Sequence, residues 1–388
     1  MSKITRLCAW TMARIIKVFK RRAPIIFIVF AVVVFIFKWR LVCLNVHPRL
    51  HVSRMCTSFE NGQSLGNLCH SLCKSRDSTS ISCHSFSSEK ETVFSGVWMN
   101  NSAVFKSTKP LVNQKLTEKL DSTNDDYSME NDFVTKIRTI IKTKFNLSIN
   151  DIDAKRMSYI QYSEVGGNRY TEMKNVWSLI HDNEYLALTL YEKFDIFPKL
   201  LGTCGSLYAV EKLDSISGYW HLMTLYDTQK EWEKRIKISL KILDFLLHLE
   251  EGLPEPMLIC DVKMNHFGIT NDFKKIKYLD LDSVHPLSVA NKITANGAPC
   301  KKHSDCDLSD CRSFCNLITF KCQQGVMNNN LQIVCERIFL GWVMSGRIMV
   351  PGLLFDPKAP SVLIDVLEQC ANPSKEEGTP RSPATKEI

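Results

Sequence analysis

LICDVKMNHFGITNDFKKIKYLDLD, the stretch from Leu258 to Asp282, combines two short apolar segments with polar residues at characteristic spacing. The first apolar segment leads into Asp261, and Lys263 follows two residues later. The second, Ile276 to Leu281, carries Asp280. Phosphoryl transfer from a nucleotide needs a carboxylate that takes the acceptor's proton, a lysine beside the moving phosphate, and a later aspartate that binds Mg²⁺. The stretch presents these groups in that order.

The spacing within this stretch follows that of a protein-kinase catalytic loop. In that loop a lysine lies two residues after the aspartate and an asparagine lies five residues after it. The metal-binding aspartate lies roughly 15–20 residues beyond the first aspartate. Asp261, Lys263 and Asp280 keep this spacing. His266 occupies the place of the asparagine, and Asn265 comes one residue early. The alternative is a β-hairpin with solvated polar residues at its turn, because Asp-x-Lys is common by chance.

The composition of the chain is that of a globular protein. Hydrophobic residues make up 45% of the chain and charged residues 23%. A length of 388 residues is enough for one large domain or two modest ones. The net charge of +8 is unevenly distributed, since the first 58 residues contain no Asp or Glu. This asymmetry is typical of a targeting segment, so no nucleic-acid partner is predicted.

The N-terminal region has the pattern of a membrane anchor. Residues 1–22 are basic, and the run from Ala23 to Phe37 has no polar side chain. This run is shorter than the roughly 20 residues that span a bilayer, but it lengthens if Lys38 and Arg40 reach the headgroups. We predict a signal-anchor transmembrane helix at residues 23–44, a cytosolic tail before it and a lumenal chain after it. A cleaved signal peptide and a buried core helix are the alternatives.

The cysteines support a lumenal location. The chain has 15 cysteines, and 14 of them lie at or beyond the end of the apolar run. Such usage is typical of disulfides in an oxidising compartment. A compact group comprises Cys300, Cys306, Cys311, Cys315 and Cys322. Zinc is the alternative ligand, but the Cys-x2-Cys pairs of a zinc ribbon are missing, so we predict disulfides of unassigned connectivity.

Several segments are predicted to lie outside the core. Residues 45–90 are rich in Ser and Cys, and we expect a cysteine-rich lumenal stem. The tail, residues 371–388, is rich in Pro, Lys, Glu and Ser and is expected to be disordered. Glycosylation sequons at Asn100 and Asn146 fit a lumenal chain, although such triplets also arise by chance.

Two short strands, Thr92 to Trp98 and Ser102 to Lys106, are predicted after the stem. The second ends on Lys106, as does the strand of a kinase small lobe that carries the phosphate-holding lysine. An ordinary lysine at the end of a strand is the alternative. Residues 109–135 are polar and acidic and are predicted to be a loop, followed by helical spacing up to Phe145.

A helix from Met173 to Phe194 is predicted next, with Glu184 within it. The strand Leu207 to Glu211 then leads to a polar break. In a kinase small lobe, a helix glutamate in this place orients the phosphate-holding lysine, which here would be Lys106. A solvated helix glutamate is the alternative.

Further along the chain, Trp232 to Leu249 has the clearest amphipathic pattern, and it ends before the opening stretch as a kinase helix does before the catalytic loop. Helices are also predicted at Asn330 to Met344 and at Val362 to Leu367. The segment Gln161 to Glu172 has the glycine and the final glutamate of a calcium loop but lacks its early carboxylates, so Ca²⁺ binding is not predicted.

CDVKMNHFGI, the LDLD segment, the cluster CKKHSDCDLSDCRSFCNLITFKC and the following NNNLQIVCERIF resemble the divergent protein kinase domain 1 family. These are cysteine-rich, signal-anchored proteins of the endoplasmic reticulum. The resemblance extends from the apolar anchor to about Cys370. It implies an α+β, bilobal protein-kinase-like fold with disulfide-rich insertions, a small lobe at residues 91–213 and a large lobe at residues 214–370. It also implies a single-pass type II protein of the endoplasmic reticulum membrane, with unidentified lumenal partners or substrates.

The resemblance assigns roles by motif position. It implies ATP and Mg²⁺ as cofactors, with the following residues in the site: Lys106 and Glu184 at the nucleotide phosphates, Asp261 and Lys263 in catalysis, Asn265 and His266 at the cofactor, and Asp280 and Asp282 at the metal. Two departures from the family pattern bear on catalysis. His266 replaces an amide, although hard cations prefer oxygen ligands, and Asp280-Leu281-Asp282 lacks the usual glycine.

Three functions are compatible with these patterns. The first is a lumenal kinase that phosphorylates secretory proteins or glycans. The second, which the departures favour, is a nucleotide-binding pseudokinase or weak kinase. The third is a cysteine-rich interaction protein without a nucleotide site. All kinase-like interpretations require Lys106, Glu184, Asp261 and Asp280 to converge in one cleft.

Overall fold

The computed structural model describes residues 27–34, 46–74, 82–83, 90–109, 126–160, 169–219, 228–294, 296–323, 325–344 and 347–385. Residues 27–34 are helical and exposed, and the rest of the predicted anchor lies outside these ranges. Among the described residues, none of the helices combines the length and the hydropathy of a membrane span. The anchor at residues 23–44 therefore stays a prediction. Residues 161–168 of the calcium-loop-like segment also lie outside the described part.

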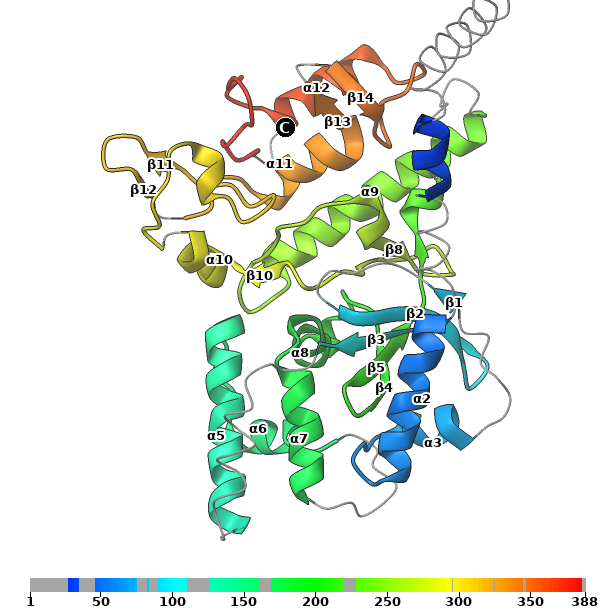
Figure 1. Cartoon of the computed structure of the whole chain (residues 1–388). Coiled ribbons are helices and arrows are strands. Elements are labelled where there is room, and N and C mark those ends of the chain that lie inside the picture. Colours follow the sequence, from blue (N-terminus) through cyan, green and yellow to red (C-terminus); the bar gives the residue numbers. More distant parts are fainter. Residues whose placement is uncertain are drawn as a thin grey trace, which may run out of the picture.

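The chain folds into a sheet-containing small lobe and a mainly helical large lobe (Figure 1). The small lobe is built on an antiparallel sheet whose strands lie in the order β1-β2-β3-β5-β4. These strands are β1 (Ser82–Cys83), β2 (Lys90–Trp98), β3 (Asn101–Thr108), β4 (Leu200–Cys204) and β5 (Leu207–Glu211). The expected mixture of helices and strands is confirmed, and the predicted strands in this region are all present.

Side chains of the β2–β3 hairpin alternate between the two faces of the sheet, as the two-residue period of a strand requires. Val93 and Val104 belong to the main core, together with Leu186 of the helix α8 (Asn183–Leu190) (Figure 1). Phe94 and Phe105 stack on the opposite face with ring centroids 4.9 Å apart. The hairpin turns at Met99 and Asn100, both with positive φ, so the sequon at Asn100 lies exposed at the tip.

The segment predicted as a stem instead completes the small lobe. Residues 45–90 contain α2 (Val46–Glu60) and α3 (Asn67–Lys74), which pack on the Phe94 and Phe105 face of the sheet (Figure 1). Disulfides join Cys56 to Cys73 and Cys69 to Cys204 of β4. The prediction missed this packing because the apolar residues are few and separated, but Val52, Met55 and Leu68 all reach one buried cluster.

Helices on the other face differ in their limits from the predictions. The predicted loop at residues 109–135 is wrong in its second part, because α5 (Asp126–Phe145) begins within it. The predicted helix Met173 to Phe194 is interrupted, giving α7 (Arg169–Ile180), α8 (Asn183–Leu190) and the single turn η1 (Glu192–Phe194). The break falls at Asp182, whose side chain accepts a hydrogen bond from Tyr185 N and caps α8. The short helix α6 (Asp151–Met157) lies between α5 and α7.

The large lobe surrounds α9 (Gln229–Glu251), which confirms and extends the predicted amphipathic helix. A capping box between Thr228 and Glu231 begins α9, and the buried Arg235 within it pairs with Asp356. Seven strands of the large lobe form two pairs and one group of three, namely β7 (Met257–Ile259) with β10 (Val284–Pro286), β13 (Gly341–Met344) with β14 (Arg347–Pro351), and β6 (Asp214–Ser215) with β8 (Phe267–Ile269) and β9 (Ile276–Tyr278). Short helical turns are η2 (Ile216–Tyr219) and η4 (Met264–His266).

The C-terminal helices are shorter than predicted at one point and longer at another. The predicted helix Asn330 to Met344 consists of α11 (Asn330–Val334), the π-helical η6 (Cys335–Leu340) and strand β13. The helical part ends at Gly341, whose φ of 109° is not helical. Glycine suits this position because a residue with a side chain rarely adopts that conformation. The last helix, α12 (Ser361–Ala371), includes the predicted Val362 to Leu367, and Cys335 is joined to Cys370.

The cysteine cluster consists of disulfides, as predicted. Cys300 pairs with Cys315 and Cys306 with Cys322, around η5 (His303–Cys306) and the strands β11 (Cys315–Asn316) and β12 (Lys321–Cys322). The remaining cluster cysteine, Cys311, is joined to Cys260 beside α10 (Leu287–Thr294). The zinc interpretation is wrong for these residues, because a sulfur in a disulfide is not a thiolate ligand.

The predicted disorder of residues 371–388 is contradicted up to residue 385. Arg381 is buried, pairs with Asp307 of the cysteine cluster and donates to Ser313 O. Arg312 in turn donates to Pro380 O with a 2.6 Å separation. The composition predicted disorder because the tail has few apolar residues. Ion pairs and hydrogen bonds instead hold the tail against the cysteine cluster.

The Cys69–Cys204 disulfide should be the main covalent support of the small lobe. It links residues 135 apart in sequence, whereas Cys56–Cys73 links residues only 17 apart. Replacing both Cys69 and Cys204 by alanine should reduce the free energy of unfolding by about 2–5 kcal/mol, because longer closed loops lose more chain entropy in the unfolded state. The Cys56/Cys73 double variant is the matched control, and its effect should be about 2 kcal/mol smaller. Urea unfolding of the oxidised proteins measures both, and an equal or larger effect in the control would contradict the expectation.

Candidate functional site

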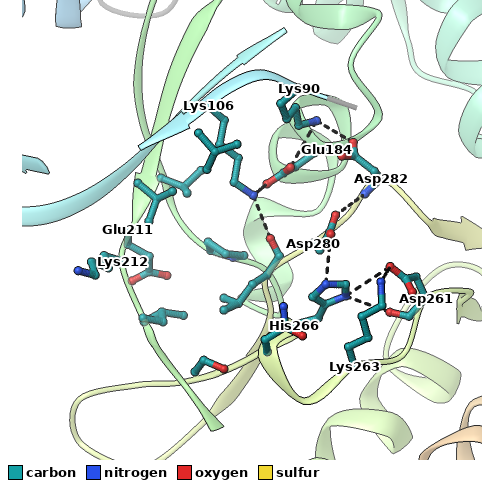
Figure 2. Close-up of a pocket in the computed structure, with 18 of the residues that line it drawn as sticks. Lys90, Lys106, Glu184, Glu211, Lys212, Asp261, Lys263, His266, Asp280 and Asp282 are labelled. Atoms are coloured by element: carbon teal, nitrogen blue, oxygen red, sulfur yellow. Dashed lines mark hydrogen bonds and ion pairs between the residues drawn. The ribbon is translucent and has the colours of Figure 1, made fainter. Parts of the chain in front are cut away.

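A cavity of about 620 Å³ lies between the two lobes and is lined by the residues that the sequence singled out (Figure 2). Its volume lies within the roughly 300–1,000 Å³ of small-molecule sites. All eight predicted catalytic, cofactor and metal residues line it, namely Lys106, Glu184, Asp261, Lys263, Asn265, His266, Asp280 and Asp282. The four side chains that a kinase-like interpretation requires in one cleft, Lys106, Glu184, Asp261 and Asp280, therefore line the same cavity.

Lys106 and Glu184 form an ion pair at the inner wall of the cavity (Figure 2). Lys106 projects from β3, and its ammonium also donates to Leu279 O at 3.1 Å. Glu184 lies in the first turn of α8 and is 1% exposed. A carboxylate this deeply buried needs a charged partner, since desolvation of a lone charge is strongly unfavourable. The pair therefore holds the strand and the helix together and directs one lysine into the cavity.

A second lysine, Lys90, enters the site and was not predicted. Its ammonium lies 2.7 Å from Asp282 Oδ1, 2.7 Å from Asp182 Oδ2 and 3.4 Å from Glu184 Oε2. Burial lowers the pKa of Lys90, but Glu184, Asp182 and Asp282 outweigh burial and raise that pKa well above its ordinary value. Lys90 is thus a permanent cation at this end of the cavity.

The reason for missing Lys90 is local. Strict alternation along β2 would place Lys90 on the face opposite Val93, away from the cavity. The pairing of β2 with β3 shifts in register between Lys90 and Thr92, and this irregularity brings Lys90 to the cavity side. The sequence carries no signal for such a shift.

The polar turn after β7 places Asp261 and His266 opposite Asp280 (Figure 2). His266 Nδ1 donates to Asp261 O at 3.0 Å, because a carbonyl oxygen can only accept. The other ring nitrogen, Nε2, lies 3.4 Å from Asp280 Oδ2. Lys263 pairs with Asp261 at 2.8 Å. His266 is buried and faces Asp280, whereas Asn265 is exposed at the rim, so the histidine holds the position expected of the amide.

The backbone around Asp261 is fixed by the cysteine cluster. Asp310 N donates to Cys260 O at 2.9 Å, and its carboxylate accepts from Val262 N at 2.8 Å. The Cys260–Cys311 disulfide lies immediately beside these bonds. The Tyr278 hydroxyl also donates to Asp261 O at 2.5 Å, and burial together with Asp280 raises the pKa of Tyr278 well above its usual value. Asp261 is thus held from both sides while its carboxylate stays in the cavity.

The cavity also has apolar walls, and it ends at the segment that links the lobes, where Glu211 and Lys212 line it (Figure 2). Its walls include Val93, Val104, Val210 and Leu279. Glu211, at the end of β5, accepts from Lys277 at 2.6 Å and from Lys199 N at 2.8 Å, which fixes the linking segment. The valine and leucine side chains suit the flat base of a nucleotide, and the lysines at the opposite end of the cavity suit its anionic phosphates.

The donor set can accept a divalent ion. Ligand atoms of Glu184, Asp280 and Asp282 lie within 4.8 Å of one another, and so do those of Asp261, His266 and Asp280. Carboxylate oxygens suit Mg²⁺ and Mn²⁺, whereas the imidazole of His266 suits Zn²⁺ better. Burial and repulsion by Glu184 raise the pKa of Asp282 to about 7, although Lys90 acts in the opposite direction. Asp280 is shared by both sets and is the best-placed metal ligand.

The described end of the calcium-loop-like segment, residues 169–172, lies outside this donor set. Its final residue, Glu172, lies in α7. One carboxylate oxygen of Glu172 accepts from Ile160 N at 2.9 Å, and the other pairs with Arg169 at 2.8 Å. Both oxygens of the glutamate therefore have protein partners.

Two protein-family models match the chain. One is described as the protein-kinase domain of FAM69 and matches residues 176–373, slightly more than half of the chain. The other is described as the N-terminal cysteine-rich ER region of FAM69 and matches residues 16–159. Together they include every residue of the cavity that was predicted from the sequence.

Asp310 should be a positioning residue for the turn that carries Asp261. Replacing Asp310 by alanine removes the acceptor of Val262 N, and an unpaired buried amide costs about 1–3 kcal/mol. We expect amide hydrogen exchange in residues 258–266 to become at least about tenfold faster. Asp305→Ala is the control, because Asp305 belongs to the same cluster but binds only local amides. Exchange that is unchanged in Asp310→Ala, or equally raised in the control, would contradict this role.

Proposed function

Because the chain belongs to the FAM69 family of kinase-like proteins, we propose that it binds a nucleoside triphosphate in the cavity between its lobes, as a pseudokinase or weak kinase. The observation that carries this proposal is the Lys106–Glu184 ion pair opposite Asp280 in one cavity. A kinase-like fold needs this pair and the metal-binding aspartate together to hold a nucleotide. The proposed compartment is the lumen of the secretory pathway.

The cavity offers matching partners to each part of the nucleotide. The apolar walls around Val104 and Val210 suit the base, and Lys106 suits the phosphates. Asp280 would hold a divalent ion, with His266 and Asp261 as further ligands in reach. Such an ion would neutralise phosphate charge when bound.

The polar turn supports slow transfer at most. Asp261 is placed to accept the proton of an acceptor hydroxyl, and its side chain is about a quarter exposed, at 25%. In this structure, however, the imidazole of His266 takes the place of a metal-binding amide. This replacement weakens a Mg²⁺-dependent site, which is why a pseudokinase or weak kinase is proposed over an efficient enzyme.

A lumenal location is supported by the covalent structure and by the family. Six disulfides join twelve cysteines in the described part of the chain. Disulfides persist in oxidising compartments and are rare in the cytosol. The proposal includes a type II anchor at residues 23–44 and lumenal proteins as partners or substrates.

Nucleotide binding should be measurable as thermal stabilisation. ATP with Mg²⁺ or Mn²⁺ at about 100 times its dissociation constant should stabilise the oxidised protein by about 2.7 kcal/mol, which raises Tm by several degrees. Asp280→Ala should abolish the metal-dependent part of this shift. Asp272→Ala is the control, because Asp272 lies on the exposed turn between β8 and β9. No shift in the wild type would instead favour a cysteine-rich interaction protein without a nucleotide site.

Catalysis should be weak in Mg²⁺ and improved by His266→Asn. An amide oxygen is a better Mg²⁺ ligand than imidazole, so we expect phosphate incorporation from labelled ATP, or ATP hydrolysis, to rise about tenfold or more in this variant. Asp261→Ala in the same background should remove the gain, since it removes the proposed proton acceptor. High activity of the wild type in Mg²⁺, lost in His266→Asn, would show an efficient kinase instead.

A further inference from the structure

Lys90 has an unusual environment for a lysine of a small-lobe strand. Its side chain is 3% exposed, and three carboxylates surround its ammonium. They come from separate parts of the fold, since Asp182 caps α8, Glu184 lies in its first turn, and Asp282 follows β9 in the large lobe. Lys90 therefore occupies the point at which both lobes and α8 meet (Figure 2).

Two of these carboxylates could otherwise hold a metal. Glu184 and Asp282, together with Asp280, form one of the sets whose oxygens lie within 4.8 Å of one another. A divalent ion placed on that set would have to approach the ammonium of Lys90, which contacts Asp282 at 2.7 Å and Glu184 at 3.4 Å. Two cations so close in a buried site repel strongly, so the lysine and an ion compete for these oxygens.

We propose that Lys90 is a built-in cation that takes the place of one divalent metal ion on Glu184 and Asp282. Its ammonium supplies the positive charge at this end of the cavity, and Asp282 is a partner of Lys90 rather than a metal ligand. A nucleotide would then need one ion, on Asp280, instead of the two that kinase sites commonly hold. The part that concerns the nucleotide rests on the proposed function, whereas the part that concerns the ion does not.

The number of carboxylates around Lys90 favours this role over that of a simple structural clasp. A clasp between lobes needs only one carboxylate per ammonium. Lys90 instead contacts three, Asp182, Glu184 and Asp282, as a divalent ion on these oxygens would. Asp280 remains as the carboxylate on which one divalent ion can lie beside Lys90.

The first test counts metal ions on the nucleotide-free protein. Mn²⁺ binding to the oxidised full chain is followed by electron paramagnetic resonance for the wild type and for Lys90→Met. The variant should gain one Mn²⁺ site, or bind Mn²⁺ at least tenfold more tightly, because Asp182, Glu184 and Asp282 lose the ammonium that all three contact. Lys90→Arg keeps the charge and should behave as the wild type. Lys277→Met is the matched control, since Lys277 is equally buried between two carboxylates, Asp195 and Glu211, but lies away from the metal set.

A second test leaves Lys90 in place, so it decides the question even if Lys90→Met does not fold. In the presence of ATP, Asp282→Ala should keep Mn²⁺ affinity within about twofold of the wild type, whereas Asp280→Ala should lower it at least tenfold. Equal losses in both variants, two tightly bound ions in the wild type, or no gain of Mn²⁺ in a folded Lys90→Met would overturn the proposal. Failure of ATP to bind would count against the proposed nucleotide function, while the Mn²⁺ count without nucleotide would still decide the role of Lys90.

Discussion

The site depends on a single buried carboxylate, Glu184, held between two lysines. Its side chain is 1% exposed, and it reaches Lys106 from β3 and Lys90 from β2. Burying an unpaired carboxylate would be strongly unfavourable, so α8 can dock on the sheet only where these ammonium groups receive it. That docking also places Lys106 against Leu279 O, just before Asp280. Strand, helix and polar turn are therefore aligned by charge, while the surrounding apolar core supplies the bulk of the stability.

Much of this site could be predicted because its chemistry has a fixed order along the chain. Asp261, Lys263 and Asp280 keep a recognisable spacing, and the strands and α9 follow clear hydrophobic periods. Lys90 and Asp182 could not be predicted in the same way. The first reaches the cavity through a shift in strand register, and the second is a helix cap whose side chain also binds that lysine. Both effects depend on three-dimensional neighbours that no local pattern records.

The segments at either end of the chain were predicted least well. Few apolar residues mark α2, α3 or the tail, so composition favoured a stem and a disordered end. The structure compensates with long-range bonds, among them Cys69–Cys204 and the pair between Arg381 and Asp307. The presence of disulfides could be predicted from the number of cysteines, but their connectivity could not, because many pairings share the same spacing. Gly66 is a residue of the sequence that marks this packing, since a Cβ there would lie 2.0 Å from Thr203 O of β4.

The attachment of Asp261 to the cysteine cluster has a consequence for how the protein matures. Cys260 and Cys311 are 51 residues apart in sequence, and the acceptor that holds Val262 N is also on the later segment. During synthesis, the turn with Asp261 therefore emerges well before the segment that fixes it. The turn is therefore completed only once the Cys260–Cys311 disulfide has formed, which requires oxidation of both thiols. In a reducing environment the chain would lack this covalent brace, so the geometry of the cleft depends on the redox conditions around it.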